Sequence, residues 1–273
     1  EVQIIAFPEL SVTSYTCMDL FSQETLLRNA EKALLDLVNN TADLDLLTIV
    51  GCPLVSGSQL INAAVAFQRG EVLGAVPKSY LPSYKEFQEE RWFTASSHLQ
   101  QSMITIGNRE VPLDCYLIFE YDEVRVGIEI CEDLWAPLPP STRHAMAGAT
   151  LICNLSASDE TIGKAEYRRA LVTGQSARLL CGYVYADAGE GESTTDMVFA
   201  GHNMVAENGA LLAETAPFCG GMALTDIDVE RLAGERLKNT SFPAEDSANY
   251  EVVPFVLPQN VSPLTRIVSS APF

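Results

Sequence analysis

The sequence predicts an α/β fold in which strands and helices alternate along the chain. Short runs rich in apolar and β-branched residues recur between turn residues, which is typical of strands. Residues 22–39 place apolar side chains at helical spacing on one face and mostly charged ones opposite, so we expect a helix that covers a sheet face. Residues 159–180 are predicted to form a second, longer helix. These patterns alone support no class finer than α/β.

Two pairs of predicted strands are separated by residues that favour hairpins. The runs 63–68 and 72–76 flank Arg69-Gly70, and the runs 198–205 and 210–214 flank Glu207-Asn208-Gly209. Asn-Gly accepts the positive φ angles that a tight hairpin turn needs. The other predicted strands lie at residues 2–7, 46–50, 124–130, 149–153 and 182–188.

Composition narrows the classes of function. With 273 residues, of which 47% are hydrophobic, the chain can bury a large core. Its 17 basic and 36 acidic residues give a formal net charge of −19, which argues against nucleic-acid and anionic-membrane partners. No apolar run approaches the ~18 residues of a membrane span, so we also expect no membrane-embedded segment.

Cysteines and histidines bear on location and on metals. The seven cysteines are an odd number without paired spacing, which is typical of a reduced, cytoplasmic protein. The three histidines lie far apart and match no metal-binding motif, so we expect chemistry without a metal.

Three residues that can do chemistry stand at the ends of predicted strands. Glu9 and Lys78 each follow a strand-like run by one proline, and Cys131 follows residues 124–130 directly. Catalytic groups of α/β sheets gather at the carboxyl ends of strands. A carboxylate can accept the proton of a thiol, and an ammonium can stabilise the thiolate and a developing oxyanion. A buried structural cysteine with two solvated loop residues is the alternative, and spacing alone does not decide between them.

The segments around these residues resemble one family. Residues 7–11, with Tyr15 following, are similar to the first signature of the nitrilase, or carbon-nitrogen hydrolase, superfamily. Four further segments resemble, in the expected order, the amidohydrolase domain of glutamine-dependent NAD synthetases: residues 77–87, 129–135, 154–158 and 189–196. The resemblance therefore covers most of the chain.

The resemblance implies roles for individual residues. Glu9 would be the general base, Lys78 the charge stabiliser and Cys131 the nucleophile, while Glu86 would be a second glutamate that supports Lys78 and orients the substrate. The residues that would contact glutamine are Tyr15, Tyr84, Glu132, Ser158 and Lys164. Lys164 stands where some relatives have Arg, so a point charge replaces a planar fork. Ser158 could instead cap the helix that follows it.

The resemblance also implies an architecture, a four-layer α-β-β-α sandwich. Residues 1–238 would form the carbon-nitrogen hydrolase domain, without the first strand and helix of the family. Residues 239–273 carry five of the fourteen prolines, and we expect a linker or interface arm towards a C-terminal synthetase domain. No SGGxDS-type phosphate-binding loop occurs in the sequence. ATP and deamido-NAD are therefore expected only at the synthetase domain, and no cofactor in this one.

The implied function is hydrolysis of L-glutamine to L-glutamate and ammonia through a cysteine thioester. The ammonia would serve ATP-dependent NAD synthesis from deamido-NAD, in a cytoplasmic enzyme that forms a homo-oligomer. Two alternatives stay open. One is a free-standing amidase, nitrilase or carbamoylase with the same Glu-Lys-Cys triad, which activity on a panel of such substrates would reveal. The other is an inactive interaction module, which trapping of a thioester would exclude.

Overall fold

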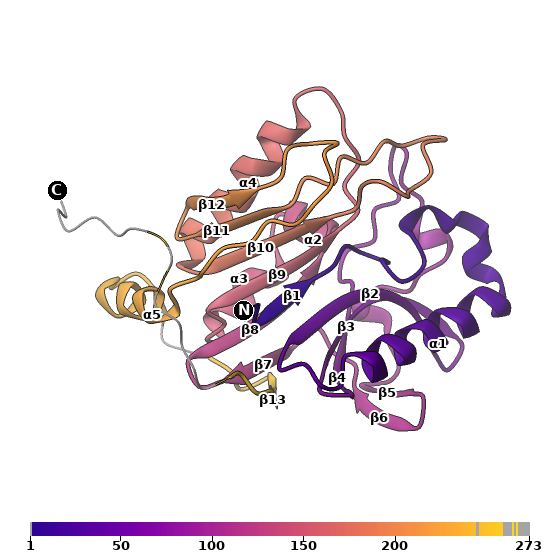
Figure 1. The fold of residues 1–273 in the computed structure, drawn as a ribbon, viewed down its shortest axis with the longest axis horizontal. Helices are drawn as coiled ribbons and strands as arrows, with labels where there is room; N and C mark the ends of the chain where they lie inside the picture. The colour runs from indigo at the N-terminus through magenta and orange to yellow at the C-terminus, as the bar shows by residue number, and fades with distance from the viewer. Residues whose placement is uncertain (1, 244–245, 259–263, 265, 267–273) are drawn as a thin grey trace.

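The computed structural model describes residues 2–243, 246–258, 264 and 266, and two β-sheets form its centre (Figure 1). The first sheet has the order β1-β2-β3-β4. Its strands are β1 (Ile4–Ala6), β2 (Leu47–Ser56), β3 (Gln59–Gln68) and β4 (Glu71–Pro77). The second has the order β12-β11-β10-β9-β8-β7-β13. Its strands are β7 (Leu117–Tyr121), β8 (Val124–Ile130), β9 (Leu151–Ser156), β10 (Gly182–Asp187), β11 (Met204–Glu207), β12 (Ala210–Glu214) and β13 (Glu251–Pro254).

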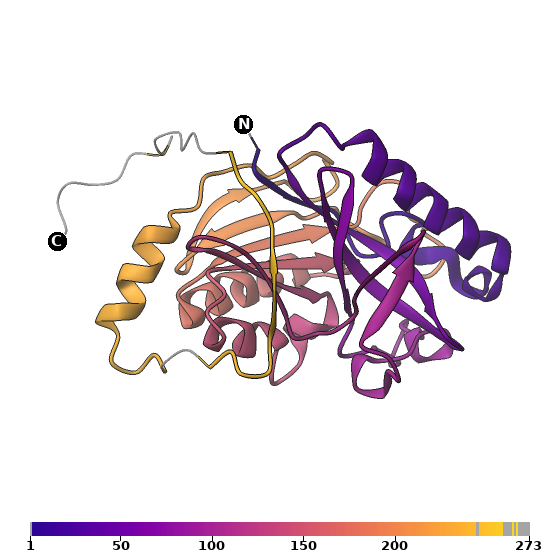
Figure 2. The ribbon, with the colours of Figure 1, turned by 90° about the horizontal axis from the view of Figure 1, so that it is seen from below.

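Helices cover the outer faces of both sheets (Figure 2). Helix α1 (Glu24–Asn40) packs on the first sheet, and α3 (Pro140–Met146) and α4 (Lys164–Leu179) pack on the second. The remaining regular elements are β5 (Met103–Ile106), β6 (Arg109–Pro112), α2 (Glu132–Trp135), α5 (Val229–Lys238) and the 3-10 helices η1 (Tyr15–Ser22), η2 (Glu89–Arg91) and η3 (Ser96–His98).

Three buried clusters hold the layers together. One joins the facing sheets, with Leu47 and Ile49 of β2 in the same cluster as Ile128 of β8. A second joins α1 to the outer face of the first sheet, and a third joins α4 to the outer face of the second. Burial of these apolar faces drives the stacking. The predicted α/β class and four-layer α-β-β-α sandwich are confirmed.

Both predicted hairpins form, but several boundaries differ from the expectation. Strands β3 and β4 pair antiparallel, as do β11 and β12, and the turn residues Asn208 and Gly209 have positive φ. The helix predicted over residues 159–180 begins only at Lys164, because Asp159 forms a bridge with Phe199 and Gly163 has φ 83°. Ser158 is therefore not a cap of this helix.

Part of the predicted proline-rich tail belongs to the second sheet. Strand β13 pairs in parallel with β7, from Glu251 opposite Leu117 to Pro254 opposite Glu120. The linker predicted for residues 239–273 thus includes an edge strand, whereas residues 244–245, 259–263, 265 and 267–273 of that prediction lie outside the described residues. Within the described part of the chain, no helix is long and apolar enough to cross a membrane.

Candidate active site

A buried ammonium lies between two buried carboxylates where the sheets meet the loops that follow their strands. Lys78 Nζ lies 2.6 Å from Oε1 of Glu9 and 2.6 Å from Oε1 of Glu89. All three side chains are excluded from solvent, with exposed fractions of at most 1%. Asn62 of β3 donates from Nδ2 to Oε1 of Glu9 at 2.6 Å. A charge pair removed from water in this way needs such additional hydrogen bonds to be tolerated.

The positions of Glu9 and Lys78 follow from two strands. Lys78 follows β4 directly, and its backbone N–H donates to the carbonyl of Asn62 in β3, so the strand pairing extends one residue further. Glu9 lies in the turn after β1, which passes against Gly51 of β2. A Cβ on Gly51 would lie 2.1 Å from the backbone nitrogen of Leu10. This close approach requires glycine, and it fixes how deeply Glu9 reaches between the sheets.

Cys131 stands between the end of β8 and the first residue of α2, with φ 46° and ψ −100°. Its backbone N–H donates to the carbonyl of Leu155 at 2.9 Å and also lies 3.2 Å from Oδ1 of Asn154. A positive φ is uncommon for a residue with a Cβ, and such strained residues cluster at functional sites. The thiol lies close enough to Glu9 and Lys78 for their charges to shift its pKa in opposite directions.

The thiol of Cys131 is held in its protonated form. Burial raises its pKa well above the ordinary value, and the charges of Glu9 and Glu89 add to this rise. The ammonium of Lys78 and the backbone N–H of Ala157 act in the opposite direction. That same N–H of Ala157 donates to Oε2 of Glu9 at 3.1 Å, so the thiol and a carboxylate share one neighbour. The arrangement suits transfer of the thiol proton to Glu9.

The charges within the site shift one another. Burial lowers the pKa of the Lys78 ammonium, but Glu89 and Glu9 outweigh burial and hold it well above its usual range. Burial raises the pKa of Glu89 to about 7, against the opposite influence of Lys78. Lys78 therefore stays charged throughout the neutral range.

The glutamate that supports Lys78 is Glu89 and not the predicted Glu86. Glu89 opens the 3-10 helix η2 and is 1% exposed, whereas Glu86 is only half-buried. The segment between Lys78 and Glu89 has little regular structure, so the spacing of its acidic residues gave no periodic signal for choosing between them. Asn62 and Ala157 were not predicted either, because neither a side-chain amide in a strand nor a backbone N–H produces a recognisable sequence motif.

Tyr15 lies behind Glu89. Its hydroxyl donates to Oε1 of Glu89 at 2.8 Å, and it is 7% exposed. Its backbone N–H donates to Oε1 of Glu192 at 2.8 Å, which joins the loop at 189–196 to this side of the site. The structure thus places the hydroxyl of Tyr15 on the carboxylate that holds Lys78.

Tyr84, Glu132 and Lys164 come together at the outer side of the site. The hydroxyl of Tyr84 donates to Oε1 of Glu132 at 2.9 Å, and the charge of Lys164 lowers the pKa of Glu132 against the larger effect of burial, which raises it. The Lys164 ammonium pairs with Asp159 and lies 5.2 Å from the ring centroid of Trp135. This group offers an ammonium, carboxylates and a hydroxyl on a partly exposed surface.

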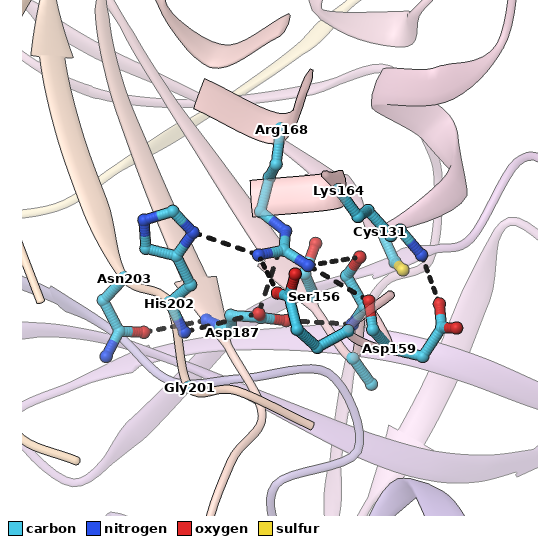
Figure 3. Close-up of polar contacts among 12 residues, drawn as sticks. Cys131, Ser156, Asp159, Lys164, Arg168, Asp187, Gly201, His202 and Asn203 are labelled. Carbon is cyan, nitrogen blue, oxygen red and sulfur yellow. Dashed lines mark hydrogen bonds and ion pairs between the residues drawn. The ribbon is translucent and has the colours of Figure 1, made fainter. Parts of the chain in front are cut away.

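Arg168, Asp187 and His202 lie in one buried polar cluster (Figure 3), and the contacts of Ser158 make it a member too. Its hydroxyl accepts from Nη2 of Arg168 at 3.3 Å, and its backbone N–H donates to Oδ1 of Asp187 at 2.9 Å. Arg168 is fully buried and also donates from Nη1 to Nδ1 of His202 at 3.0 Å. Because arginine only donates, Nδ1 of His202 is the acceptor and its Nε2 carries the proton toward Glu214. This network fixes the segment after β9 rather than presenting Ser158 to solvent.

The described residues contain no group of three or more His, Cys, Asp or Glu side chains arranged to hold a metal ion. A model of the family described as carbon-nitrogen hydrolase matches residues 1–236. The chain belongs to the carbon-nitrogen hydrolase family.

Relatives within the carbon-nitrogen hydrolases include longer proteins. The glutamine-dependent NAD(+) synthetase of Mycobacterium tuberculosis is 46% identical over 244 residues, which are 88% of this chain and 36% of that protein. The chain thus spans about a third of the length of the curated relatives that it matches. A crystal structure of a glutamine-dependent NAD(+) synthetase from Cytophaga hutchinsonii is similar with a TM-score of 0.70 and 29% identity, over 79% of this chain and 35% of that one.

A carbon-nitrogen hydrolase from Helicobacter pylori G27 shares the fold over most of its length. It has a TM-score of 0.69 at 17% identity and is matched over 88% of this chain and 82% of its own. The sandwich of carbon-nitrogen hydrolases is therefore the frame that brings Glu9, Lys78 and Cys131 together here.

Proposed function

We propose that this chain hydrolyses L-glutamine to L-glutamate and ammonia through a thioester on Cys131. The observation that carries the proposal is the buried Glu9-Lys78-Glu89 group beside a strained, buried cysteine. The relatives named glutamine-dependent NAD(+) synthetases, which match 88% of the chain, support glutamine as the substrate.

Glu9 is the general base in this proposal. Because the pKa of the Cys131 thiol is raised, the thiol is protonated at neutral pH and needs a base as it attacks. Glu9 takes the proton while the sulfur bonds to the side-chain amide carbon of glutamine. Protonated Glu9 then gives this proton to the amide nitrogen, the carbon-nitrogen bond breaks, and ammonia leaves.

Lys78 stabilises the oxyanion of the tetrahedral intermediate. Its ammonium has three donors, of which Glu9 and Glu89 engage two. The third can reach the substrate carbonyl oxygen, together with the backbone N–H of Glu132 after the nucleophile. Loss of one such donor costs roughly 10²–10³-fold in turnover.

Water completes the cycle. Glu9 removes a proton from a water molecule, whose oxygen attacks the γ-glutamyl thioester, and the intermediate collapses to glutamate. The departing thiolate recovers the proton from Glu9. The backbone N–H of Ala157, which lies against both groups, lowers the cost of the charge on either one.

The α-amino acid end of glutamine would bind at the partly exposed group around Lys164. Lys164 offers a charge for the α-carboxylate, while Glu132 and the Tyr84 hydroxyl offer acceptors for the α-ammonium. Glu86 acts electrostatically on Tyr84 and is proposed to orient the substrate. Tyr15 and Ser158 contribute from behind, by holding Glu89 and the segment after β9.

The partner would be a synthetase domain that uses the ammonia. Since the chain spans 36% of the length of such relatives, we propose a C-terminal synthetase that binds ATP and deamido-NAD and receives ammonia by channelling. The hydrolase part itself would need no cofactor. We further propose a cytoplasmic location and a homo-oligomer, in keeping with unpaired cysteines and a formal net charge of −19.

Trapping of the thioester tests the proposal. Incubation with glutamine or a γ-glutamyl electrophile should release glutamate or add an acyl mass to Cys131 only. Cys131→Ala should abolish both, whereas Cys219→Ala, at an exposed free thiol, should change neither. Faster hydrolysis of plain amides, nitriles or carbamoyl compounds than of glutamine would contradict the assignment.

A further inference from the structure

A buried carboxylate near the nucleophile has no part in the chemistry above. Asp133 lies two residues after Cys131 and is 1% exposed. Its Oδ1 accepts from the backbone N–H of Tyr80 at 2.8 Å and of Ser79 at 3.1 Å. Its Oδ2 accepts from the backbone N–H of Ile130 at 2.9 Å. The donors are thus the two residues after Lys78 and the residue before Cys131.

These donors lie at the ends of strands from different sheets. Lys78 follows β4 of the four-stranded sheet, and Cys131 follows β8 of the seven-stranded sheet. Between the sheets lies an apolar cluster that includes Val76 and Ile130. Apolar packing is not directional, so it does not by itself fix how the two strand ends lie relative to each other. Hydrogen bonds that both strand ends donate to one carboxylate are directional and do fix it.

The strand pairing explains why the backbone N–H of Ile130 needs this acceptor. The N–H of Cys131 donates to Leu155 of β9, so the N–H of Ile130 points to the opposite side of β8. There β7 pairs with β8 only as far as Val126. Asp133 supplies the partner that the ladder does not, at the point where the backbone turns into the strained conformation of Cys131.

Another buried carboxylate provides a comparison. Glu129, two residues before Cys131, is also 1% exposed. It accepts from the backbone N–H of Ser141 at 2.8 Å and from the hydroxyl of Tyr183. It therefore ties β8 to the helix layer and to β10, away from Lys78. Burial raises the pKa of both carboxyls. Asp133 and Glu129 therefore differ chiefly in the groups that donate hydrogen bonds to them.

We propose that Asp133 is a positioning residue that fixes the ammonium of Lys78 relative to the sulfur of Cys131, by binding the backbone on both sides of the site. As a statement about catalysis it rests on the proposed glutamine hydrolysis. As a statement about geometry it applies to the thiol whatever the substrate is.

The variant Asp133→Asn tests this through turnover. An amide has one acceptor and one donor end, so either the Ile130 N–H or the Ser79 and Tyr80 N–H groups would face another N–H. Misplacement of reacting groups by about 1 Å costs about 10²-fold. We expect kcat for glutamine to fall by about that factor with KM little changed, because no substrate contact is removed. Glu129→Gln is the matched control, for which kcat should stay near that of the wild type.

Alkylation of Cys131 by iodoacetamide as a function of pH gives a second readout without glutamine. Lys78 lowers the pKa of the thiol, so its displacement should move the alkylation profile to higher pH. Mere removal of a negative charge near the thiol would move the profile to lower pH. The direction of the shift therefore separates displacement from a charge effect. Thermal unfolding of both variants, measured alongside, establishes that the proteins are folded at the assay temperature.

The proposal is overturned if Asp133→Asn has the same kcat and the same alkylation profile as Glu129→Gln. It is also overturned if the alkylation profile of Asp133→Asn moves to lower pH. If Asp133→Asn does not fold, Asp133→Glu carries the same readouts, since it keeps the charge but is one methylene longer. A wild-type protein that does not hydrolyse glutamine would contradict the proposed function alone, because the alkylation profiles would still test Asp133.

Discussion

The ammonium of Lys78 lies 2.6 Å from Oε1 of Glu89, and neither side chain has access to solvent. Lys78 comes from the end of a strand and Glu89 from a 3-10 helix eleven residues later. Removal of one partner from such a pair leaves an uncompensated buried charge, which is strongly destabilising. Glu89 is therefore the carboxylate of this segment that pairs with Lys78.

Glu89→Gln keeps the shape of the side chain and removes its charge, so Lys78 loses its larger electrostatic partner. We expect kcat for glutamine to fall by about 10²-fold, the cost of a misplaced catalytic group. Glu86→Gln on the same segment should instead raise KM, because the charge of Glu86 acts on Tyr84. Steady-state kinetics of both variants make the comparison. A larger fall in kcat for Glu86→Gln would return the supporting role to Glu86.

Gly51→Ala should displace Glu9. The added Cβ would lie 2.1 Å from the backbone nitrogen of Leu10 and 2.7 Å from the backbone carbon of Glu9, and backbone atoms cannot rotate away. We expect a loss of about 1–3 kcal/mol in stability and a fall in kcat of about 10²-fold.

Gly74→Ala is the matched control for Gly51→Ala. Its added Cβ would lie 3.1 Å from Cδ1 of Leu117, a side-chain atom that can shift. It should lower the melting temperature while kcat stays close to that of the wild type. Equal losses of kcat in both variants would contradict the positional role of Gly51.

Lys164→Met removes the ammonium proposed to bind the α-carboxylate of glutamine. An unpaired substrate charge costs about 1–3 kcal/mol, so kcat/KM for glutamine should fall while that for a plain aliphatic amide changes little. Lys238→Met, at an exposed lysine of α5, is the control for loss of a positive charge. If Lys164→Met lowered both activities equally, Lys164 would not be a determinant of specificity.

Stability should fall as the pH rises through neutrality. Burial raises the pKa of Glu89 and of Asp187 to about 7. The unfolded chain ionises these groups near pH 4, so over the interval up to about pH 8 the folded state binds more protons and loses stability with rising pH.

One buried histidine opposes this trend only at lower pH. Burial lowers the pKa of His144 to about 4. Because the ordinary pKa of histidine is about 6.5, His144 makes the folded state more stable as the pH rises from about 4 to about 6.5. Melting temperatures should therefore decline between about pH 6.5 and about pH 8. Asp187→Asn should reduce this slope, and a melting temperature that rises over the interval would contradict the assignment.

Glutamine hydrolysis by this chain alone should be slow. A glutaminase that ran freely would waste glutamine, so we expect the synthetase to raise its activity, and a ligand can do so only if it binds better when the hydrolase site is assembled. A longer protein that includes the synthetase should be stimulated by deamido-NAD and ATP. Melting temperatures of the two proteins control for plain destabilisation of the hydrolase part. Glutamine hydrolysis by this chain as fast as that of the fully liganded longer protein would refute the coupling.

Local patterns predicted most of the elements that carry the site. Alternating apolar residues marked the strand before Cys131, and Asn208-Gly209 marked a hairpin, because pleating and positive φ depend on neighbours in sequence. Strand β13 was missed because it pairs with β7, more than a hundred residues earlier. The start of α4 was placed too early, because the bridge from Asp159 to Phe199 is a tertiary contact.

The sequence by itself determined that an acid, an amine and a thiol follow strand ends. Its resemblance to a family assigned catalytic roles to Glu9, Lys78 and Cys131. Only the tertiary structure decided which carboxylates surround the amine. Glu86 and Glu89 are both glutamates and lie three residues apart in the sequence. Only Glu89 enters the buried space beside Lys78. Asp133 likewise acquires its role from two sheets that meet in space. Hydrogen bonds and ion pairs depend on distances of a few ångströms between atoms, and spacing along the chain does not specify those distances.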